Sequence, residues 1–255
     1  MAIVAVAGDV CTTTAIALAS AWPVSDDVVF VESDPSGGDL ASWFDMPVTP
    51  SLSTVVTRVL DGAWVDVERL TRLADSGIRL IPAPPRAGEA GQAVGESART
   101  LVPTLAALRS PVTIADTGRL HPPSAAHPFV ASAAVNVVVH RQAPQSSRAA
   151  AVRLQRLAEQ LEAFAATAST LIVAIVGAAP FDIGEIESFL SDSVGVNAVV
   201  GLPVDDITAA VYGGRTGVSE RRLARLPLAR AARDLATVAE RSVHDAAGGL
   251  WRAAR

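Results

Sequence analysis

Three polar segments, each placed directly after an apolar run, contain the residues that could do chemistry. They are residues 8–14, GDVCTTT, residues 32–41, ESDPSGGDLA, and residues 113–118, TIADTG. Backbone N–H groups at a glycine turn suit a phosphate group, while hydroxyl and carboxylate oxygens suit Mg²⁺. Since ligands of α/β folds sit beyond the carboxyl ends of the strands, the chemistry of this chain is expected at these three segments.

The first segment has only part of what a phosphate-binding loop needs. Such a loop uses glycines so that consecutive N–H groups surround the phosphate, a lysine that neutralises it, and a hydroxyl that holds Mg²⁺. All 21 basic residues of this chain are arginine, so a lysine-dependent mechanism is excluded. Asp9 adds negative charge, and the side chains of Asp9 and Cys11 hinder the close approach that glycine permits.

The elements that must position these segments follow from short β-branched runs alternating with longer amphipathic stretches. This pattern predicts an α/β fold: a mostly parallel, twisted sheet with helices on both faces. We expect strands near residues 2–7, 28–32, 78–82, 112–116, 135–140, 171–176 and 197–201. We expect helices near residues 13–21, 51–60, 66–75, 89–108, 147–168 and 183–193, with starts at Ser51, Asp66 and Asp182.

The chain of 255 residues, half of them hydrophobic, is long enough for one large domain spanning residues 1–255. No apolar run approaches the roughly 20 residues that cross a bilayer, and no basic leader precedes the first apolar run. The single cysteine excludes an internal disulfide. We expect a cytoplasmic protein.

Charge is distributed unevenly along the chain. Residues 215–255 contain nine arginines and four acids, net +5, whereas residues 1–214 contain twelve arginines and twenty-two acids, net −10. Within this Arg-rich segment, residues 219–245 predict one or two helices, interrupted at Pro227. The segment could face an acidic partner, or simply be a solvated helix face.

In their order and spacing, the three polar segments resemble the MinD/ParA group of deviant P-loop ATPases. That group has an N-terminal strand–loop–helix, a DxDPxGGD-like segment, and an apolar strand ending in DTG. The resemblance extends through FDIGEIESFL at 181–190, GLPVDD at 201–206 and GGRTGVSERRLARLPLARAARDLA at 213–236. These last stretches look like actinobacterial MinD-like proteins linked to chromosome partitioning and pilus assembly. The resemblance implies a P-loop-type fold.

The chain departs from the family pattern at several positions of the phosphate-binding loop. The family loop reads roughly KGGVGKTT, which places Ala7 and Thr12 at its two lysines and Asp9 and Cys11 at two glycines. Since a charge-assisted hydrogen bond is worth roughly 1.5–3 kcal/mol, each lost lysine costs about one to two decades of affinity. The family's adenine pocket often includes an asparagine after the strand that here ends near Val176, and none is present. We expect weak or absent ATP binding.

The resemblance also implies roles for particular residues. Thr13, Asp34 and Asp116 match its Mg²⁺ positions, and Asp34 also matches its water-orienting, catalytic carboxylate. The candidate nucleotide-binding residues are Gly8, Asp9, Val10, Cys11, Thr12, Thr13, Thr14, Pro203 and Asp205. Structural explanations remain open: the threonines at 12–14 capping a helix, Asp34 starting a turn, and Asp116 ending a strand.

Three functions stay open on these grounds. The first is a non-hydrolysing pseudo-ATPase that acts as a protein-binding localisation or partitioning module, with no cofactor. The second is a divergent ATPase that uses ATP and Mg²⁺ as a dimer switch, with Arg86, Arg119 or Arg215 of a facing subunit replacing the lysines. The third is a partition protein that binds DNA through its Arg-rich segment.

The partner cannot be read from the residues. Homodimerisation follows from the resemblance alone, and direct membrane anchoring is not expected because only Leu250 and Trp251 are large and apolar after Val243. The four histidines show no metal-ligand spacing with the cysteine.

Overall fold

A computed structural model describes residues 3–23, 28–61, 71–73, 77–107, 111–119, 124–142, 146–165 and 170–253. These residues form an eight-stranded sheet with the order β3-β4-β2-β5-β1-β6-β7-β8. Its strands are β1 (Ile3–Gly8), β2 (Val28–Glu32), β3 (Arg72–Leu73), β4 (Arg79–Ile81), β5 (Val112–Asp116), β6 (Val135–Arg141), β7 (Leu171–Val176) and β8 (Ala198–Leu202). Seven strands are parallel, while β3 pairs antiparallel with β4.

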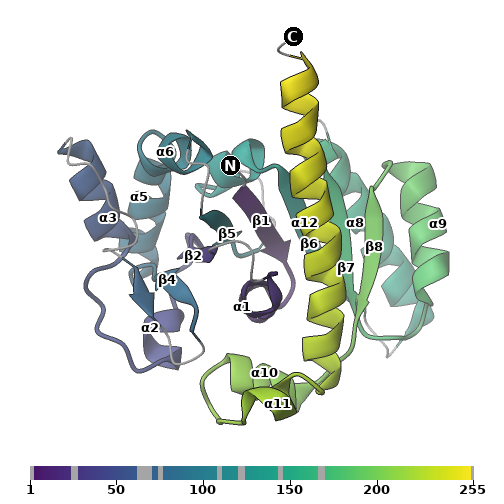
Figure 1. The fold of residues 1–255 in the computed structure, drawn as a ribbon. Helices are drawn as coiled ribbons and strands as arrows, with labels where there is room; N and C mark the ends of the chain where they lie inside the picture. Colours follow the sequence, from purple (N-terminus) through teal and green to yellow (C-terminus); the bar gives the residue numbers. More distant parts are fainter. Residues whose placement is uncertain are drawn as a thin grey trace.

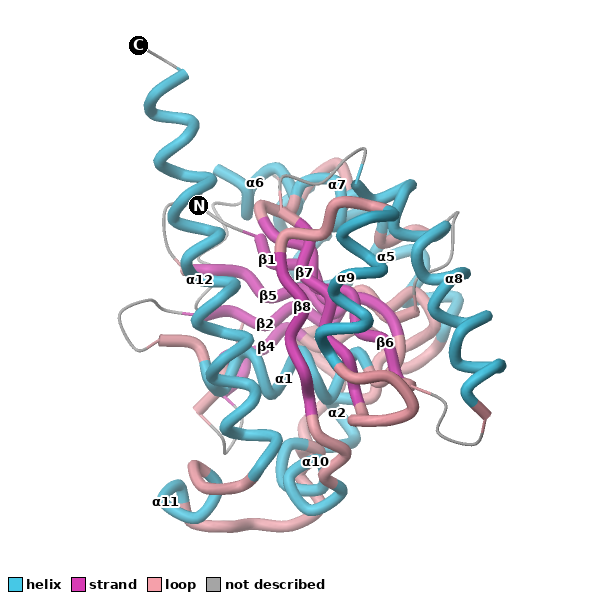
Figure 2. The backbone as a smooth tube through the Cα atoms, turned by 90° about the vertical axis from the view of Figure 1, so that its right-hand side faces the viewer, coloured by secondary structure: helices cyan, strands magenta, loops and turns pink. Residues whose placement is uncertain are grey.

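Helices cover both faces of this sheet (Figure 1 and Figure 2). One face packs against α3 (Leu52–Leu60), α5 (Ala87–Ser97), α6 (Leu101–Ala107), α7 (His127–Ser132), α8 (Ser147–Ala165) and α9 (Ile183–Ser193). The other packs against α1 (Cys11–Ala21), α2 (Leu40–Trp43), α10 (Asp206–Tyr212) and α12 (Pro227–Ala253), and α11 (Glu220–Leu223) precedes α12. The predicted α/β fold is thereby confirmed. None of the described helices is long and apolar enough to cross a membrane.

The central strands are buried on both faces, as an enclosed parallel sheet requires. Every residue of β5 and β7 is buried, as are the first five of β1. This explains why these strands read as continuous apolar runs and why their positions were predicted closely. Short elements with weaker patterns, namely β3, α2, α7 and α10, were missed.

Two predicted helices need correction. The helix expected at 66–75 is wrong in part, because Arg72–Leu73 form an edge strand; Asp66 lies outside the described residues. The single helix expected at 89–108 is two helices, α5 and α6. Pro103 has no N–H to donate to the carbonyl of residue 99, so an α-helix cannot run uninterrupted through this segment.

The remaining helix boundaries agree with the local chemistry. Ser51 and Asp182 each begin a helix with a capping box. Pro227 is the first residue of α12, where its missing N–H is not needed, so the predicted interruption is confirmed.

The topology brings the functional candidates to one edge of the sheet. In a parallel sheet the carboxyl ends of the strands lie at the same edge, and the loops that follow β1, β2, β5, β6 and β8 all leave from there. The three polar segments therefore lie beside one another, although residues 15–112 separate the first from the last.

Candidate functional site

The turn from β1 into α1 is held between the ends of two neighbouring strands. Gly8 N–H donates to Gly118 O at 2.9 Å, and Asp9 N–H donates to Val139 O at 2.9 Å. Gly8 has a φ of +113°, and a Cβ there would lie 2.2 Å from Val139 O. Only glycine fits this position, both for its backbone conformation and for the close approach.

Val10 begins α1 in an unusual way. It has φ 45° and ψ 35°, the left-handed region, and no side chain caps the helix. Thr14 Oγ1 donates back to Val10 O at 3.1 Å. Because α1 begins at Cys11, the predicted start at residue 13 is two residues late, and Thr12, Thr13 and Thr14 lie inside the helix rather than at its N-cap position. The capping explanation for these threonines is therefore wrong.

Cys11 closes the inner side of the turn against β5. Its thiol contacts Asp116 Oδ1 at 2.8 Å and Val6 O at 3.0 Å, and both side chains are buried. Burial raises the pKa of the Cys11 thiol well above its usual value, and the Asp116 charge raises it further. The sulfur therefore stays a protonated donor, not a nucleophilic thiolate.

Asp116 ends β5 with one oxygen engaged and one without a partner. Oδ1 also accepts from Gly118 N–H at 3.1 Å, whereas Oδ2 is buried and has no hydrogen-bond partner among the described residues. Burial raises the pKa of Asp116 above its usual value, while hydrogen bonds from Cys11, Thr12 and Gly118 oppose that rise. More than a strand-ending residue, Asp116 is a buried carboxyl group under the turn.

Asp34 comes to the same turn as Asp116. A Cβ on Gly118 would lie 2.3 Å from Asp34 Cγ, so the Asp34 carboxylate packs directly on that glycine. Ser33 ties the two segments together, because its N–H and its hydroxyl both donate to Asp116 O at 2.8 Å. Asp34 Oδ1 also accepts from Ser36 N–H at 2.7 Å, which is the turn chemistry expected of Asp-Pro.

Glu32 is an organising residue that sequence reasoning did not single out. Its side chain is 2% exposed, and its oxygens accept from Asp39 N–H at 2.7 Å, Leu40 N–H at 3.1 Å and Ala83 N–H at 2.8 Å. Burial raises the pKa of Glu32 to about 7, against the three N–H bonds, which lower it. The sequence did contain a signal for this role, because Glu32 is an acid at the end of an apolar strand and shortly before a Gly-Gly pair.

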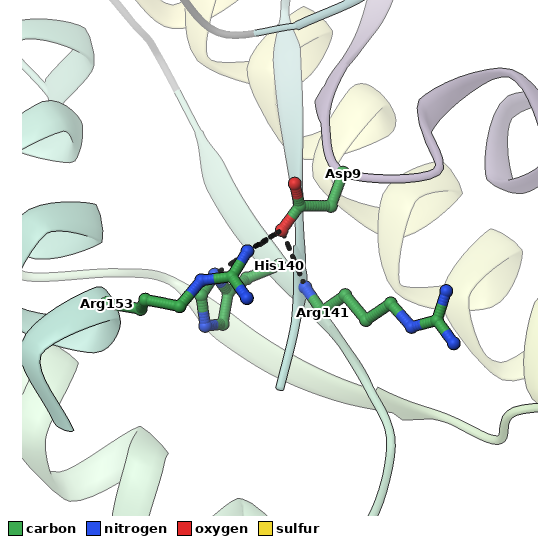
Figure 3. A network of polar contacts seen from close by, with 4 residues as sticks. All are labelled: Asp9, His140, Arg141 and Arg153. Carbon is green, nitrogen blue, oxygen red and sulfur yellow. Dashed lines mark hydrogen bonds and ion pairs between the residues drawn. The ribbon is translucent and has the colours of Figure 1, made fainter. Parts of the chain in front are cut away.

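Asp9 points toward β6 and α8 (Figure 3). Its Oδ2 accepts from Arg141 N–H at 3.1 Å and lies 3.7 Å from Arg153 Nη2 and 3.9 Å from His140 Nδ1. Burial lowers the pKa of His140, and Arg153 lowers it further, while Asp9 opposes the shift. The imidazole is therefore neutral near pH 7, and Arg153 is the ionic partner of Asp9.

No protein-family model matches the sequence, and no curated protein matches it. Solved structures do match over nearly the whole chain. A ParA family ATPase from Chlorobium tepidum has a TM-score of 0.66 at 15% identity, covering 92% of this chain and 97% of that one. The fold is that of the ParA and MinD ATPases.

Two further structures with this fold carry informative ligands or partners. An ATP complex of Cyanothece McdA has a TM-score of 0.61 at 16% identity, covering 94% of this chain and 96% of that one. A MinC:MinD complex from Aquifex aeolicus has a TM-score of 0.58 at 15% identity, covering 92% and 93%. At such identities the similarity concerns the ParA/MinD fold alone.

The turn after β1 lacks groups that hold a magnesium-bound triphosphate in a phosphate-binding loop. No lysine occurs in the sequence, Asp9 places a carboxylate at the turn, and Cys11 engages Asp116 Oδ1. Asp34 and Asp116 do come together at Gly118, and Thr13 lies in the first turn of α1. Their joint role in holding Mg²⁺ stays a prediction.

The other candidates take part in local structure. Asp205 caps α10 by accepting from Thr208 N–H at 3.0 Å, and it also accepts from Leu228 N–H at 3.2 Å. Burial raises the pKa of Asp205, but the bonds from Thr208 and Leu228 outweigh it and hold the pKa below its usual value. Pro203 precedes this cap and is half-buried.

The three arginines proposed as lysine substitutes are all exposed. Arg86 lies 3.4 Å from Glu89, and Arg119 and Arg215 lie in loops. Within the described ranges, no three His, Cys, Asp or Glu side chains are grouped as metal ligands; His121 lies outside those ranges.

Proposed function

We propose that this protein is a ParA/MinD-like pseudo-ATPase: a binding module for localisation or partitioning that does not hydrolyse ATP. The observation that supports this most is the turn after β1, where Asp9 is paired with Arg153 and Cys11 rests on Asp116. Both side chains stand where a phosphate-binding loop needs glycine. The side chains of Asp9 and Cys11 thus already have partners within the same chain, namely Arg153 and Asp116.

Electrostatics support the same conclusion. A phosphate approaching this turn meets the Asp9 carboxylate, and the acids Asp34 and Asp116 lie behind it. In an ordinary site a lysine and Mg²⁺ offset such repulsion. Each missing charge-assisted bond costs about 1.5–3 kcal/mol, so two missing lysines remove about two to four decades of affinity.

A protein partner suits a fold of this kind. The MinC:MinD complex is one example of a MinD protein bound to another protein. A chain that keeps this fold but does not bind phosphate can still act by binding other molecules at its surface. We propose a cytoplasmic protein whose partner is another protein, with homodimerisation as a further expectation.

Calorimetric titration with ATP and Mg²⁺ tests the proposal. The nucleotide-free protein should show no binding up to millimolar ATP. A variant combining Thr12→Lys, Asp9→Gly and Cys11→Gly should gain measurable affinity. Micromolar binding by the unmodified protein would overturn the proposal and favour the dimer switch, with Arg86, Arg119 or Arg215 of a facing subunit as the phosphate ligand.

A second function, DNA binding, is favoured by one specific observation. Six arginines between residues 215 and 233 are all exposed, and the same stretch contains a single acid, Glu220. They are Arg215, Arg221, Arg222, Arg225, Arg230 and Arg233. Phosphate contacts by such residues weaken steeply with salt. Gel shifts at 50 mM and 200 mM salt should show a loss of about 10³ in affinity if about six contacts form; salt-independent or absent binding removes this function.

A further inference from the structure

An apolar groove lies between α8 and α9, on the sheet face opposite α12. It encloses about 390 Å³ and is lined by Ala151, Leu154, Gln155, Phe181, Glu185, Ile186 and Phe189. Phe189, on the α9 side of the groove, is 37% exposed. An open apolar groove between two helices can accept a third helix.

The α9 side of the groove is acidic. Glu185 lines it, the exposed Asp182 and Asp192 lie on the same side of α9 by helical spacing, and this helix contains no basic residue. Between Arg156 and Arg215 the sequence has eight acids and no arginine, lysine or histidine. An occupant with basic residues along one border of its apolar face would complement this wall.

Both walls are connected to the turn after β1. Arg153, which pairs with Asp9, precedes the groove residue Leu154 on α8. On the other side, Gln142 accepts from Phe181 N–H at 3.1 Å and donates to Phe181 O at 2.9 Å. Gln142 directly follows Arg141, whose N–H donates to Asp9. The carboxylate of Asp9 is therefore linked to the α8 side of the groove through Arg153. It is linked to the Phe181 side through Arg141 and Gln142 at the end of β6.

We infer that the α8–α9 groove is the docking site for a protein partner, which inserts an amphipathic helix with basic residues on the border facing α9. The inference rests on the proposed binding function and names its site. Asp9 acts here as a positioning residue that holds the two walls in register. The partner is a different protein, because the apolar face of α12, the basic helix of a second copy, is buried in its own core through Leu228, Leu235 and Ala236.

The test uses the full-length protein and a phage-displayed library of helical peptides. Selection is made on the wild type alone, and the enriched peptides are then tested on Ala151→Trp, whose indole fills the groove from an exposed position on α8. Ala149→Trp, also exposed on α8 but outside the groove lining, is the matched control. Circular dichroism establishes that all variants are folded.

Selected peptides should carry apolar residues at i, i+3 or i+4, and i+7, with arginine or lysine at the border. By fluorescence anisotropy, a selected peptide should lose at least about tenfold affinity on Ala151→Trp and none on Ala149→Trp. The double change Glu185→Arg, Asp192→Arg should weaken binding roughly fivefold to tenfold and make it less sensitive to salt. Asp9→Ala should weaken binding although Asp9 is not in the groove lining.

Four outcomes would overturn the inference. Equal binding of an enriched peptide to the wild type and to Ala151→Trp would place the site elsewhere. Acidic or neutral borders would contradict the charge argument, as would failure to enrich any peptide. If sedimentation velocity shows a dimer that Ala151→Trp dissociates, the occupant is a second copy. ATP titration does not involve the groove, so failure here and failure of the proposed function are distinguishable.

Discussion

Glycine is required at position 8 because the backbone carbonyl of Val139 leaves no room for a side chain. With a φ of +113° and Val139 O 2.2 Å from a would-be Cβ, alanine at this position requires both strained dihedrals and movement of β6. Gly8→Ala should therefore destabilise the protein by about 2–4 kcal/mol, measured by urea unfolding.

Gly77→Ala is the matched control for that change. Gly77 has a φ of +79°, but within the described part of the chain nothing lies within 4 Å of its would-be Cβ. It should cost only the left-handed conformation, about 1–2 kcal/mol. Equal losses in the two variants would mean that the approach of β6 does not matter.

Glu32 makes the stability of the fold depend on pH. Its folded pKa of about 7 lies above the ordinary value of 4.5, so the native state binds more protons than the unfolded state between those values. Stability from this group is fully present below pH 4.5 and is lost as pH rises to about 7. The full difference corresponds to about 3 kcal/mol.

Replacing Glu32 with glutamine should remove this dependence. Urea unfolding of Glu32→Gln at pH 5 and pH 8 should show a smaller loss of stability on going to pH 8 than in the wild type, since glutamine does not titrate. Glu187→Gln, at an exposed position on α9, is the control and should leave the wild-type profile unchanged. Parallel profiles for wild type and Glu32→Gln would contradict the assignment.

At the scale of elements, Asp205 links two helices that are separated in the chain. It caps α10 through Thr208 and also accepts from Leu228 at the start of α12. Asp205→Ala should cost about 1–2 kcal/mol, the upper range for loss of an N-cap, because a second helix start is unpaired as well. Thermal unfolding should show a Tm lower by about 2–8 °C.

Asp182→Ala provides the comparison for Asp205→Ala. Asp182 also caps a helix with a capping box, but its side chain has no hydrogen bond to a second element among the described residues. Its loss should be the smaller of the two. A larger loss at Asp182 would mean that the link to α12 contributes nothing.

Elements were predictable where one pattern dominated. β1, β5 and β7 are buried on both faces and read as unbroken apolar runs. Ser51 and Asp182 correctly predicted the starts of their helices. The division of α5 from α6 and the strand at Arg72–Leu73 were missed, because a proline three residues into a helix and a two-residue edge strand leave little periodic signal. Asp9 was predicted to repel phosphate, but its pairing with Arg153 depends on β6 and α8 meeting the turn, which spacing in the sequence does not specify.

For the whole molecule, the strand order sets where the fold opens first. β1 lies between β5 and β6 near the middle of the sheet, whereas β3 is a two-residue strand at one edge. Amide hydrogen exchange should be slowest in β1, β5 and β6, approaching the rate of global unfolding, and much faster in β3. Peptide-resolved mass spectrometry measures this. Comparable protection at β3 and β1 would contradict the expected gradient.

The same strand order explains how much of the candidate site was predictable. Once the strands are parallel, their carboxyl ends coincide, so Gly8, Asp34 and Asp116 could be expected together from sequence alone. The groove between α8 and α9 could not, because it depends on how far apart two helices sit on a sheet. Neither Leu154 nor Phe189 differs in the sequence from an ordinary core residue.

Because Asp9 pairs with Arg153, the effect of one substitution at this turn depends on which other substitutions are already present. Each substitution at this turn changes the setting in which the next one acts, so their effects are epistatic. A lysine introduced at position 12 while Asp9 and Asp116 remain would find carboxylates as partners before any phosphate. Removing Asp9 first would instead release the guanidinium of Arg153, 3.7 Å away. The order in which substitutions are introduced at this turn therefore matters, and a single substitution should produce almost no phosphate binding.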